Sequence, residues 1–287
     1  MRKCESAKVD ALRRVGFDGT WDGWRAAARG ALEAGLAPAS VMWEEAGDEQ
    51  AALPGLAANA AVETAAPGRF RVPRRFFELG EAAACHRDPS RWGLLYRILW
   101  RVTNGEPRLL DVAVDPDVHR LLAMEKAVRR ATHKMKAFVR FRAVEDEAGT
   151  CYVAWFEPGH RVTERVAPFF AERFPSMRWT ILTPDACAHW DGESLAFAPG
   201  VPRAMAPAPD ALEAAWRTYY ASTFNPARLR PAAMRAEMPI RYWRNLPEAG
   251  LIAPLLADAP ARVRRMIEEQ GAGRVTEERM RRPDRAS

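Results

Sequence analysis

The chain has 287 residues, of which 48% are hydrophobic and 28% are charged, a composition typical of a globular protein of one large or two smaller domains. It contains no apolar run of about 18 residues and no apolar segment near its start, which excludes a spanning helix and a secretory signal, so we expect a cytoplasmic protein. The formal net charge of +6 suits a polyanionic partner.

The first 46 residues predict a small β-α-β element. Thr20 follows the turn pair Asp18-Gly19 and is a suitable N-cap for a helix. The elements expected in chain order are a strand near 9–17, a helix over 21–34 and a strand near 41–43. Residues 47–70 are rich in alanine and show no helical or strand period, so we interpret them as a linker.

Residues 71–198 predict an α+β domain with an antiparallel sheet in the order ββαβββ, covered by helices. The longest helix opens at Asp115-Pro116-Asp117, because proline fits a first helical turn and acids favour the positive end of the helix. Asp191-Gly192 is a hairpin signal. The other expected elements are helices over 74–86, 91–102 and 161–174, a hairpin over 138–157, and strands over 177–183, 186–190 and 194–197.

The C-terminal part is predicted to be helical and loosely attached. Residues 199–209 contain four prolines and predict a stiff, exposed linker. Residues 210–270 predict a helical segment, with helices near 210–221 and 247–270. The charged tail, 271–287, is expected to be disordered.

The sequence gives no sign of a metal or cofactor site, and we expect neither. The cysteines are widely separated and form no CxxC motif, so reduced, partly buried thiols are expected. They are Cys4, Cys85, Cys151 and Cys187. No Walker, GxGxxG, HExxH or EF-hand pattern occurs, which argues against an NTPase or a nicotinamide enzyme.

Cys187, His189 and Asp191 alternate on a predicted strand and invite a catalytic interpretation. Residues two apart on a strand lie about 7 Å apart with parallel side chains. A nucleophile and its base need a separation of about 3 Å. Asp191 is also required by the turn, so we do not predict a triad.

A basic junction lies within residues 131–156. Alternation predicts a strand over 138–144, with Val139 and Phe141 facing a core and arginines on the opposite face. A basic helix end precedes it, so helix and strand deliver positive charge to one corner, as a phosphate-binding surface requires. The candidate DNA-binding residues are His133, Lys134, Lys136, Arg140 and Arg142. A solvated rim of a half-buried sheet is the alternative; for His133 a structural role and general-base catalysis also stay open.

A second basic stretch, residues 216–246, interleaves arginines with aromatic residues. Arginine with aromatic rings can hold phosphates while stacking on bases. The same composition also suits a protein-docking surface, and packing of the rings in a core is a third possibility. The candidate nucleic-acid-binding residues here are Arg228, Arg230, Arg235, Arg241, Trp243 and Arg244.

Several motifs together resemble a known family. They are FDGTWDGW at 17–24, HKMKAFVRFR at 133–142, PFFAERFP at 168–175, WDG at 190–192 and MPIRYWRNL at 238–246. The chain resembles a bacterial family of DNA-metabolism proteins, a domain of unknown function that is associated with a radical-SAM protein and found fused to uracil-DNA-glycosylase-like proteins. The resemblance spans about residues 15–248.

The resemblance implies a DNA-binding accessory protein in bacterial DNA repair or modification. Its expected partners are DNA, single- or double-stranded, and a radical-SAM or uracil-DNA-glycosylase-like protein, with no membrane involved. No catalytic residue carries over, so the resemblance leaves open whether the protein is an enzyme. The alternatives are a lesion-processing enzyme of glycosylase or lyase type, which would flip a base into a pocket near His133, and a protein adaptor without DNA contact.

Overall fold

The structure is a computed structural model that describes residues 12–46, 70–146, 149–206, 238–243, 246 and, in part, 249–265. The chain divides into two compact units, Met1–His133 with Gly159–Val162, and Lys134–Pro158 with Thr163–Ser287. Outside the described residues lie the predicted linker up to residue 69, the end of the proline-rich linker at 207–209, the predicted helix near 210–221 and the tail 271–287. The predicted domain boundaries stay predictions.

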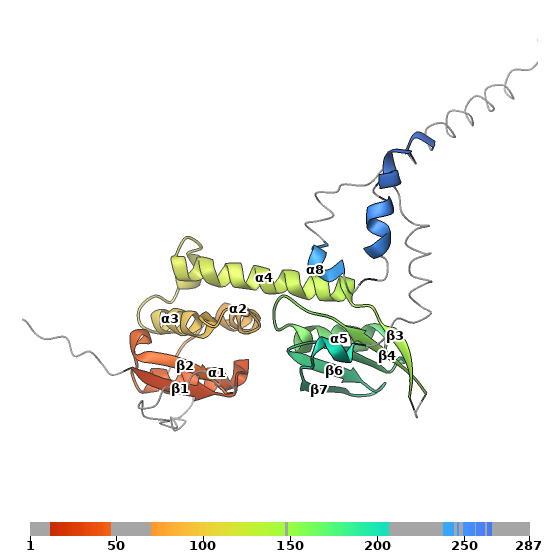
Figure 1. Cartoon of the computed structure of the whole chain (residues 1–287). Coiled ribbons are helices and arrows are strands. Elements are labelled where there is room, and N and C mark those ends of the chain that lie inside the picture. The colour runs from red at the N-terminus through yellow and green to blue at the C-terminus, as the bar shows by residue number, and fades with distance from the viewer. Residues whose placement is uncertain are drawn as a thin grey trace, which may run out of the picture. The chain divides into compact units, whose positions relative to one another are not determined.

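The first unit begins with the predicted β-α-β element, which is confirmed (Figure 1). The two strands are parallel, with Val15 opposite Trp43, because a single helix connects them and returns the chain to the same edge. The predicted N-cap is also confirmed, since the Thr20 hydroxyl accepts a hydrogen bond of 3.0 Å from the backbone N–H of Gly23. The elements are β1 (Arg13–Phe17), α1 (Trp21–Glu33), the 3-10 turn η1 (Pro38–Ser40) and β2 (Val41–Glu45).

The motif at 17–24 is explained by close packing at this cap. Asp18 Oδ1 accepts hydrogen bonds from the backbone N–H and the hydroxyl of Thr20, at 2.9 and 2.7 Å. A Cβ on Gly23 would lie 1.9 Å from the same carboxylate oxygen. The spacing of aspartate, threonine and glycine therefore describes one turn, in which glycine is required for space.

The helices of the first unit enclose an aromatic core. Trp24 is fully buried and stacks on Trp21 and Trp92, with ring centroids 5.2 and 5.7 Å apart. Replacing a buried tryptophan such as this one by alanine costs about 3–5 kcal/mol. The helices are α2 (Arg74–Ala84), α3 (Arg91–Thr103), the 3-10 turn η3 (Leu109–Asp111) and α4 (Pro116–Phe138), of which residues up to His133 belong to this unit.

The second unit contains a five-stranded sheet in the order β3-β4-β5-β6-β7, and the predicted α+β class is confirmed (Figure 1). The prediction that the whole sheet is antiparallel is wrong for one pair, since β4 and β5 run parallel. The cause is α5, which crosses between these two strands and returns the chain in the same direction. The elements are β3 (Arg142–Asp146), β4 (Gly149–Trp155), α5 (Thr163–Arg173), β5 (Trp179–Leu182), β6 (Ala186–Trp190) and β7 (Leu195–Pro199).

A stack of three rings joins distant parts of the second unit. Tyr242, on the short helix α8 (Ile240–Trp243), is 1% exposed and lies between Phe138 and Phe156. The ring centroids are 5.7 and 5.1 Å from that of Tyr242. This tyrosine of the second basic stretch is therefore a core residue of its unit.

The first residues after β7 stay attached to the sheet. The backbone N–H of Val201 donates to the carbonyl of Thr183 at 3.0 Å. A Cβ on Gly200 would lie 2.1 Å from the carbonyl oxygen of Pro184, so the chain passes too close here for a side chain. A 3-10 turn, η4 (Arg203–Met205), follows. Further along, the described residues of 249–265 are helical.

Candidate nucleic-acid interface

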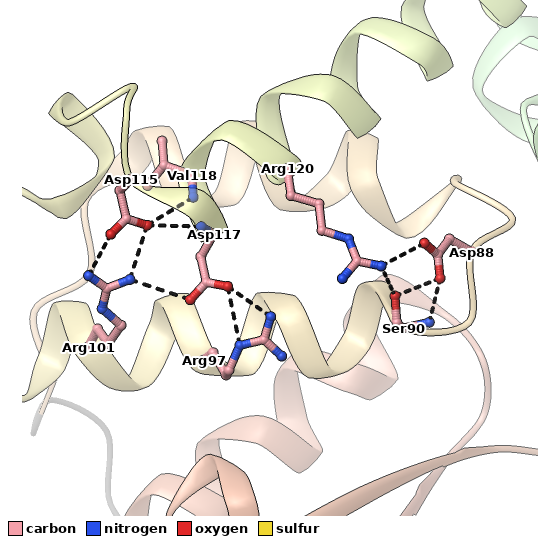
Figure 2. A network of polar contacts seen from close by, with 8 residues as sticks. All are labelled: Asp88, Ser90, Arg97, Arg101, Asp115, Asp117, Val118 and Arg120. Atoms are coloured by element: carbon pink, nitrogen blue, oxygen red, sulfur yellow. Dashed lines mark hydrogen bonds and ion pairs between the residues drawn. The ribbon is translucent and has the colours of Figure 1, made fainter.

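The start of α4 is built by a carboxylate network with arginines of α3 (Figure 2). Asp115 Oδ1 accepts the backbone N–H groups of Asp117 and Val118 at 3.0 and 3.2 Å, so Asp115 caps the helix. The guanidinium of Arg101 binds both oxygens of Asp115, at 3.0 and 2.7 Å. Arg97 binds Asp117 at 2.8 Å. These arginines are therefore occupied in holding α4 on α3.

The same network shifts the proton affinity of its members. Hydrogen bonds to Glu106 and Asp115 raise the pKa of Arg101. The Ser90 hydroxyl, which donates to Asp88, and the guanidinium of Arg120 lower the pKa of Asp88 to about 2. Arg101 and Asp88 therefore stay charged at neutral pH, and both are held by ion pairs and hydrogen bonds.

The later turns of α4 carry a second set of basic residues. Lys126, Arg130 and His133 are exposed and follow each other at steps of four and three residues, which places them on one helix face. Neither Lys126 nor Arg130 has an ion-pair partner among the described residues. Arg129 lies beside this face and contacts Glu125 at 3.8 Å. At 1.5 Å rise per residue, the row from 126 to 133 spans about 10 Å.

In the second unit, the predicted strand over 138–144 is wrong at its start. Helix α4 continues to Phe138, which is held by its stack on Tyr242, and β3 begins only at Arg142. Val139 is buried and the ring of Phe141 packs against Phe170 and Trp179, as their predicted core-facing side requires. Residues 139–141 thus connect helix and strand.

The four basic side chains of this junction differ in exposure. Lys136 is exposed, and its Nζ lies 4.3 Å above the ring of Phe169. Lys134, Arg140 and Arg142 are half-buried, so the expectation that both arginines are exposed is wrong. Arg140 Nη1 donates to the carbonyls of Ala137 and Val139 at 2.8 and 3.2 Å. A guanidinium in this position caps the C-terminus of α4, and its first role is therefore structural.

The second basic stretch is described only in part, since Arg228, Arg230, Arg235 and Arg244 lie outside the described side chains. Arg241 is exposed, with its guanidinium 4.8 Å from the ring of Tyr242 and Nη2 donating to the hydroxyl of that tyrosine at 2.9 Å. The indole N–H of Trp243 donates to the carbonyl of Met238 at 2.9 Å. Of the candidate residues in this stretch, Arg241 is the one whose exposed cation the structure describes.

The set Cys187, His189 and Asp191 forms no catalytic arrangement. Cys187 is buried, and His189 is exposed with Nδ1 2.9 Å from the Thr180 hydroxyl. Asp191 accepts the backbone N–H of Ser194 and of the residue before it, and these bonds lower the pKa of Asp191 to about 2. Cys187 therefore packs in the core, His189 lies on the surface of the sheet, and Asp191 stabilises the turn.

The first unit also holds a charge cluster around the buried Arg91, which the sequence analysis missed. Arg91 is 1% exposed and donates to Glu45, as does the indole of Trp92. Arg161 binds the other carboxylate oxygen at 2.9 Å. Burial opposes ionisation of Glu45, but the hydrogen bonds from Arg161 and Trp92 outweigh it, and the pKa of this carboxyl lies below its ordinary value. Arg91 and Arg161 are 46 and 116 residues away from Glu45 in the sequence, so no local pattern indicates that they meet.

Within the described residues, no group of three or more His, Cys, Asp or Glu residues is placed to hold a metal ion. Cys85, Cys151 and Cys187 form no disulfide bond with a described residue. In the same part of the chain, no helix has the length and apolarity needed to cross a membrane.

Taken together, the fold and the exposed helix face define an α+β protein with a row of exposed basic residues on α4. The chain belongs to the family of a domain of unknown function, DUF4130, whose model matches residues 89–248. No curated protein and no solved structure matches the chain. The matched range contains α3, α4 and the sheet of the second unit, and therefore the basic row and the ion network except for Asp88.

Proposed function

We propose that this protein binds DNA through phosphate contacts and acts as an accessory to a DNA repair or modification enzyme. The observation that carries the proposal is the row of Lys126, Arg130 and His133 on α4, called the α4 row below. It is exposed, lies on a rigid element and has no ion pair from Lys126 or Arg130 to a described residue. Exposed cations without acidic partners are the groups that DNA phosphates attract.

The spacing of the α4 row fits a phosphate backbone. One strand of a duplex carries a phosphate per 3.4 Å of helix axis, so a row of about 10 Å passes several phosphates. Side chains at i, i+4 and i+7 point the same way, so they can meet one strand together. In the second unit, Lys136 and Arg241 are exposed and are further candidate contacts.

The proposal gives Arg140 and Arg142 a smaller part in DNA binding than the α4 row. Arg140 uses one guanidinium nitrogen on the carbonyls at the end of α4, and both arginines are half-buried. Substitution of Arg140 would change both the end of α4 and the affinity for DNA, so Arg140 is not the residue to substitute in the test.

The test is a salt titration of DNA affinity. We expect Lys126→Ala with Arg130→Ala to flatten the slope of log affinity against log salt by about two units, because each lost phosphate contact lowers it by about 0.9. Fluorescence anisotropy with a labelled duplex, and with its single strand, gives the slope and the preferred form. Uracil-containing and abasic duplexes test whether a lesion adds affinity.

The matched control removes the same charge elsewhere in the first unit. Arg29→Ala with Arg74→Ala replaces two exposed arginines on α1 and α2. This control should leave the slope unchanged. Equal slopes for the two double variants would show that the α4 row makes no phosphate contact, and absence of DNA binding by the native protein would favour the adaptor.

The accessory role rests on the resemblance to proteins linked with radical-SAM and uracil-DNA-glycosylase-like partners. No described residue set here forms an iron–sulfur ligand group, so the radical chemistry is assigned to the partner. A product gel with modified oligonucleotides tests this division. Strand or base cleavage by the purified protein alone would replace the accessory role by an enzymatic one.

A further inference from the structure

The segment Gly159–Val162 belongs to the first unit, although the chain before and after it belongs to the second. It is held against the turn that follows α2. The backbone N–H of Arg161 donates to the carbonyl of Cys85 at 2.9 Å. Arg87 Nε donates to the carbonyl of Gly159 at 3.1 Å. The segment is therefore fixed by direct hydrogen bonds to Cys85 and Arg87.

Two histidines complete this attachment. The rings of His86 and His160 stack with centroids 4.2 Å apart and planes 27° apart. The backbone N–H of Asp88 donates to Nδ1 of His86 at 3.1 Å, and the backbone N–H of Arg87 points at Nδ1 of His160 at 3.3 Å. A backbone N–H can only donate, so each Nδ1 carries a lone pair. Both imidazoles are therefore neutral, with the proton on Nε2.

The surroundings disfavour a charged imidazole. Burial lowers the pKa of His86 below its ordinary value of 6.5, Asp88 opposes this, and Arg91 and Arg120 add to it. The stacked neighbour, His160, is itself titratable.

Further charged groups among the described residues lie close by along the chain. Arg87 and Arg161 are adjacent in sequence to the two histidines. The Glu45 carboxylate on β2, which could offset their charge, is occupied by Arg91 and Arg161. A proton on either ring would therefore add positive charge to a group of arginines.

We propose that the His86–His160 stack is a pH-sensitive clasp, which holds Gly159–Val162 on residues 85–88 while both rings are neutral and releases it when either is protonated. Protonation places an N–H at Nδ1, where it faces the donating backbone N–H. One hydrogen bond is lost, and the new charge meets the surrounding guanidinium groups. The segment then separates from the turn while the rest of the unit stays folded.

The direction of the pH effect follows from His86. Its folded pKa lies below 6.5, so the neutral form is favoured by the closed clasp. The contribution of the clasp is complete above pH 6.5 and is lost as the pH falls through the lower folded value. Mild acidification is therefore the releasing signal.

Hydrogen exchange on the full chain tests the clasp. We expect the amides of Arg87, Asp88 and Arg161 to lose at least about tenfold in protection between about pH 7.5 and about pH 5, after correction for the intrinsic exchange rate. The amide of Leu94, which donates to the Ser90 carbonyl inside α3, is the internal reference. It should keep its protection. Equal protection of the clasp amides at both pH values would overturn the proposal, as would a parallel loss at Leu94, which would indicate general acid unfolding.

Variants separate the clasp from nearby titrations. His86→Asn with His160→Asn places a non-titrating amide oxygen where each Nδ1 accepts, so protection should stay the same between the two pH values. His160→Asn alone serves if the double variant does not fold, and should lower the pH response. His119→Asn, an exposed histidine on α4, should respond as the native protein does. Acid release that persists unchanged in the asparagine variants would contradict the assignment.

Discussion

In the first unit, α4 carries charged side chains both near its start and further along, and the two sets differ in what they contact. Near its start, Asp117 and Arg120 are tied to α3 and to the turn before it (Figure 2). Further along, Lys126 and Arg130 extend into solvent and have no ion-pair partner in the part of the chain that the structure describes. Charge near the start of the helix therefore fixes its position, and charge further along remains available to a ligand.

The net charge of +6 therefore does not measure how much positive charge is available to a partner. Many arginines of the first unit balance a carboxylate within hydrogen-bond distance, and they contribute little to an external partner. A surface for a polyanion is defined by the cations that remain, because a paired guanidinium must lose its partner before it can bind a phosphate. Four experiments test this difference between charged residues with and without an ion-pair partner among the described residues.

The largest effect is expected at the buried arginine of the first unit. Arg91→Ala should lower the free energy of unfolding by about 3–5 kcal/mol, because it removes a buried guanidinium and leaves the half-buried Glu45 carboxylate with one guanidinium fewer. Urea unfolding followed by tryptophan fluorescence measures the loss. Arg91→Met combined with Glu45→Leu should recover part of it, since an apolar pair needs no desolvation. A cost under about 1 kcal/mol for Arg91→Ala would show that the ion pair is dispensable.

A smaller loss is expected in the network at the start of α4. Arg101→Ala should cost about 2 kcal/mol, because it removes charge-assisted hydrogen bonds to Asp115 and Glu106. Arg129→Ala is the matched control, with an exposed pair to Glu125 at 3.8 Å that is worth about 0.3 kcal/mol. The same unfolding measurement compares them. Similar costs for the two variants would remove the distinction between tied and free arginines.

The acid dependence of Asp88 gives a third test. Its folded pKa of about 2 lies below the ordinary 3.8, so its ionised form stabilises the fold above pH 3.8 and this contribution is lost as the pH falls through about 2. Asp88→Asn should therefore lower the melting temperature most at about pH 5, and the difference from the native protein should shrink towards about pH 2. Thermal melts across this range measure it. A difference that is constant with pH would contradict the role of the charge.

The smallest effect on stability is expected at the α4 row. Lys126→Ala and Arg130→Ala should each change the free energy of unfolding by no more than about 0.5 kcal/mol, because both side chains are exposed on a helix surface. Thermal and urea melts of the single variants test this. A loss above about 1 kcal/mol would mean that these cations serve the fold and would weaken their assignment to DNA.

Local signals in the sequence predicted the elements well. Thr20 caps its helix, Asp115 opens α4, and Asp191 accepts the turn amides before β7, each through contacts within three residues. The start of β3 was wrong because the helix is extended by Phe138, whose ring stacks on Tyr242. That contact spans more than a hundred residues, and alternation in the sequence cannot show it. The parallel pairing of β4 and β5 likewise depends on the path of α5 between them, which the pattern of either strand does not show.

The candidate site was harder to predict than the fold, because residue type does not report what a side chain contacts. Arg140 was expected to be exposed, yet it lies on the carbonyls of Ala137 and Val139. Lys126 and Arg130 lie four residues apart, which is a local pattern, but this pattern alone cannot show that they have no acidic partner among the described residues. Those partners, as Glu45 and Arg91 illustrate, come from elsewhere in the chain.

The placement of Gly159–Val162 has a consequence for how the protein can be divided. The chain passes between the two units after residues 133, 158 and 162, so neither unit is one continuous piece of sequence. A fragment that ends at residue 133 lacks the four residues that bind Cys85, Arg87 and Glu45. Separate expression of the halves, gene fusion at 133 or domain exchange with a relative would each leave one half incomplete. A synthetic peptide containing residues 159–162, supplied in trans, is the complement that the shortened first half would require.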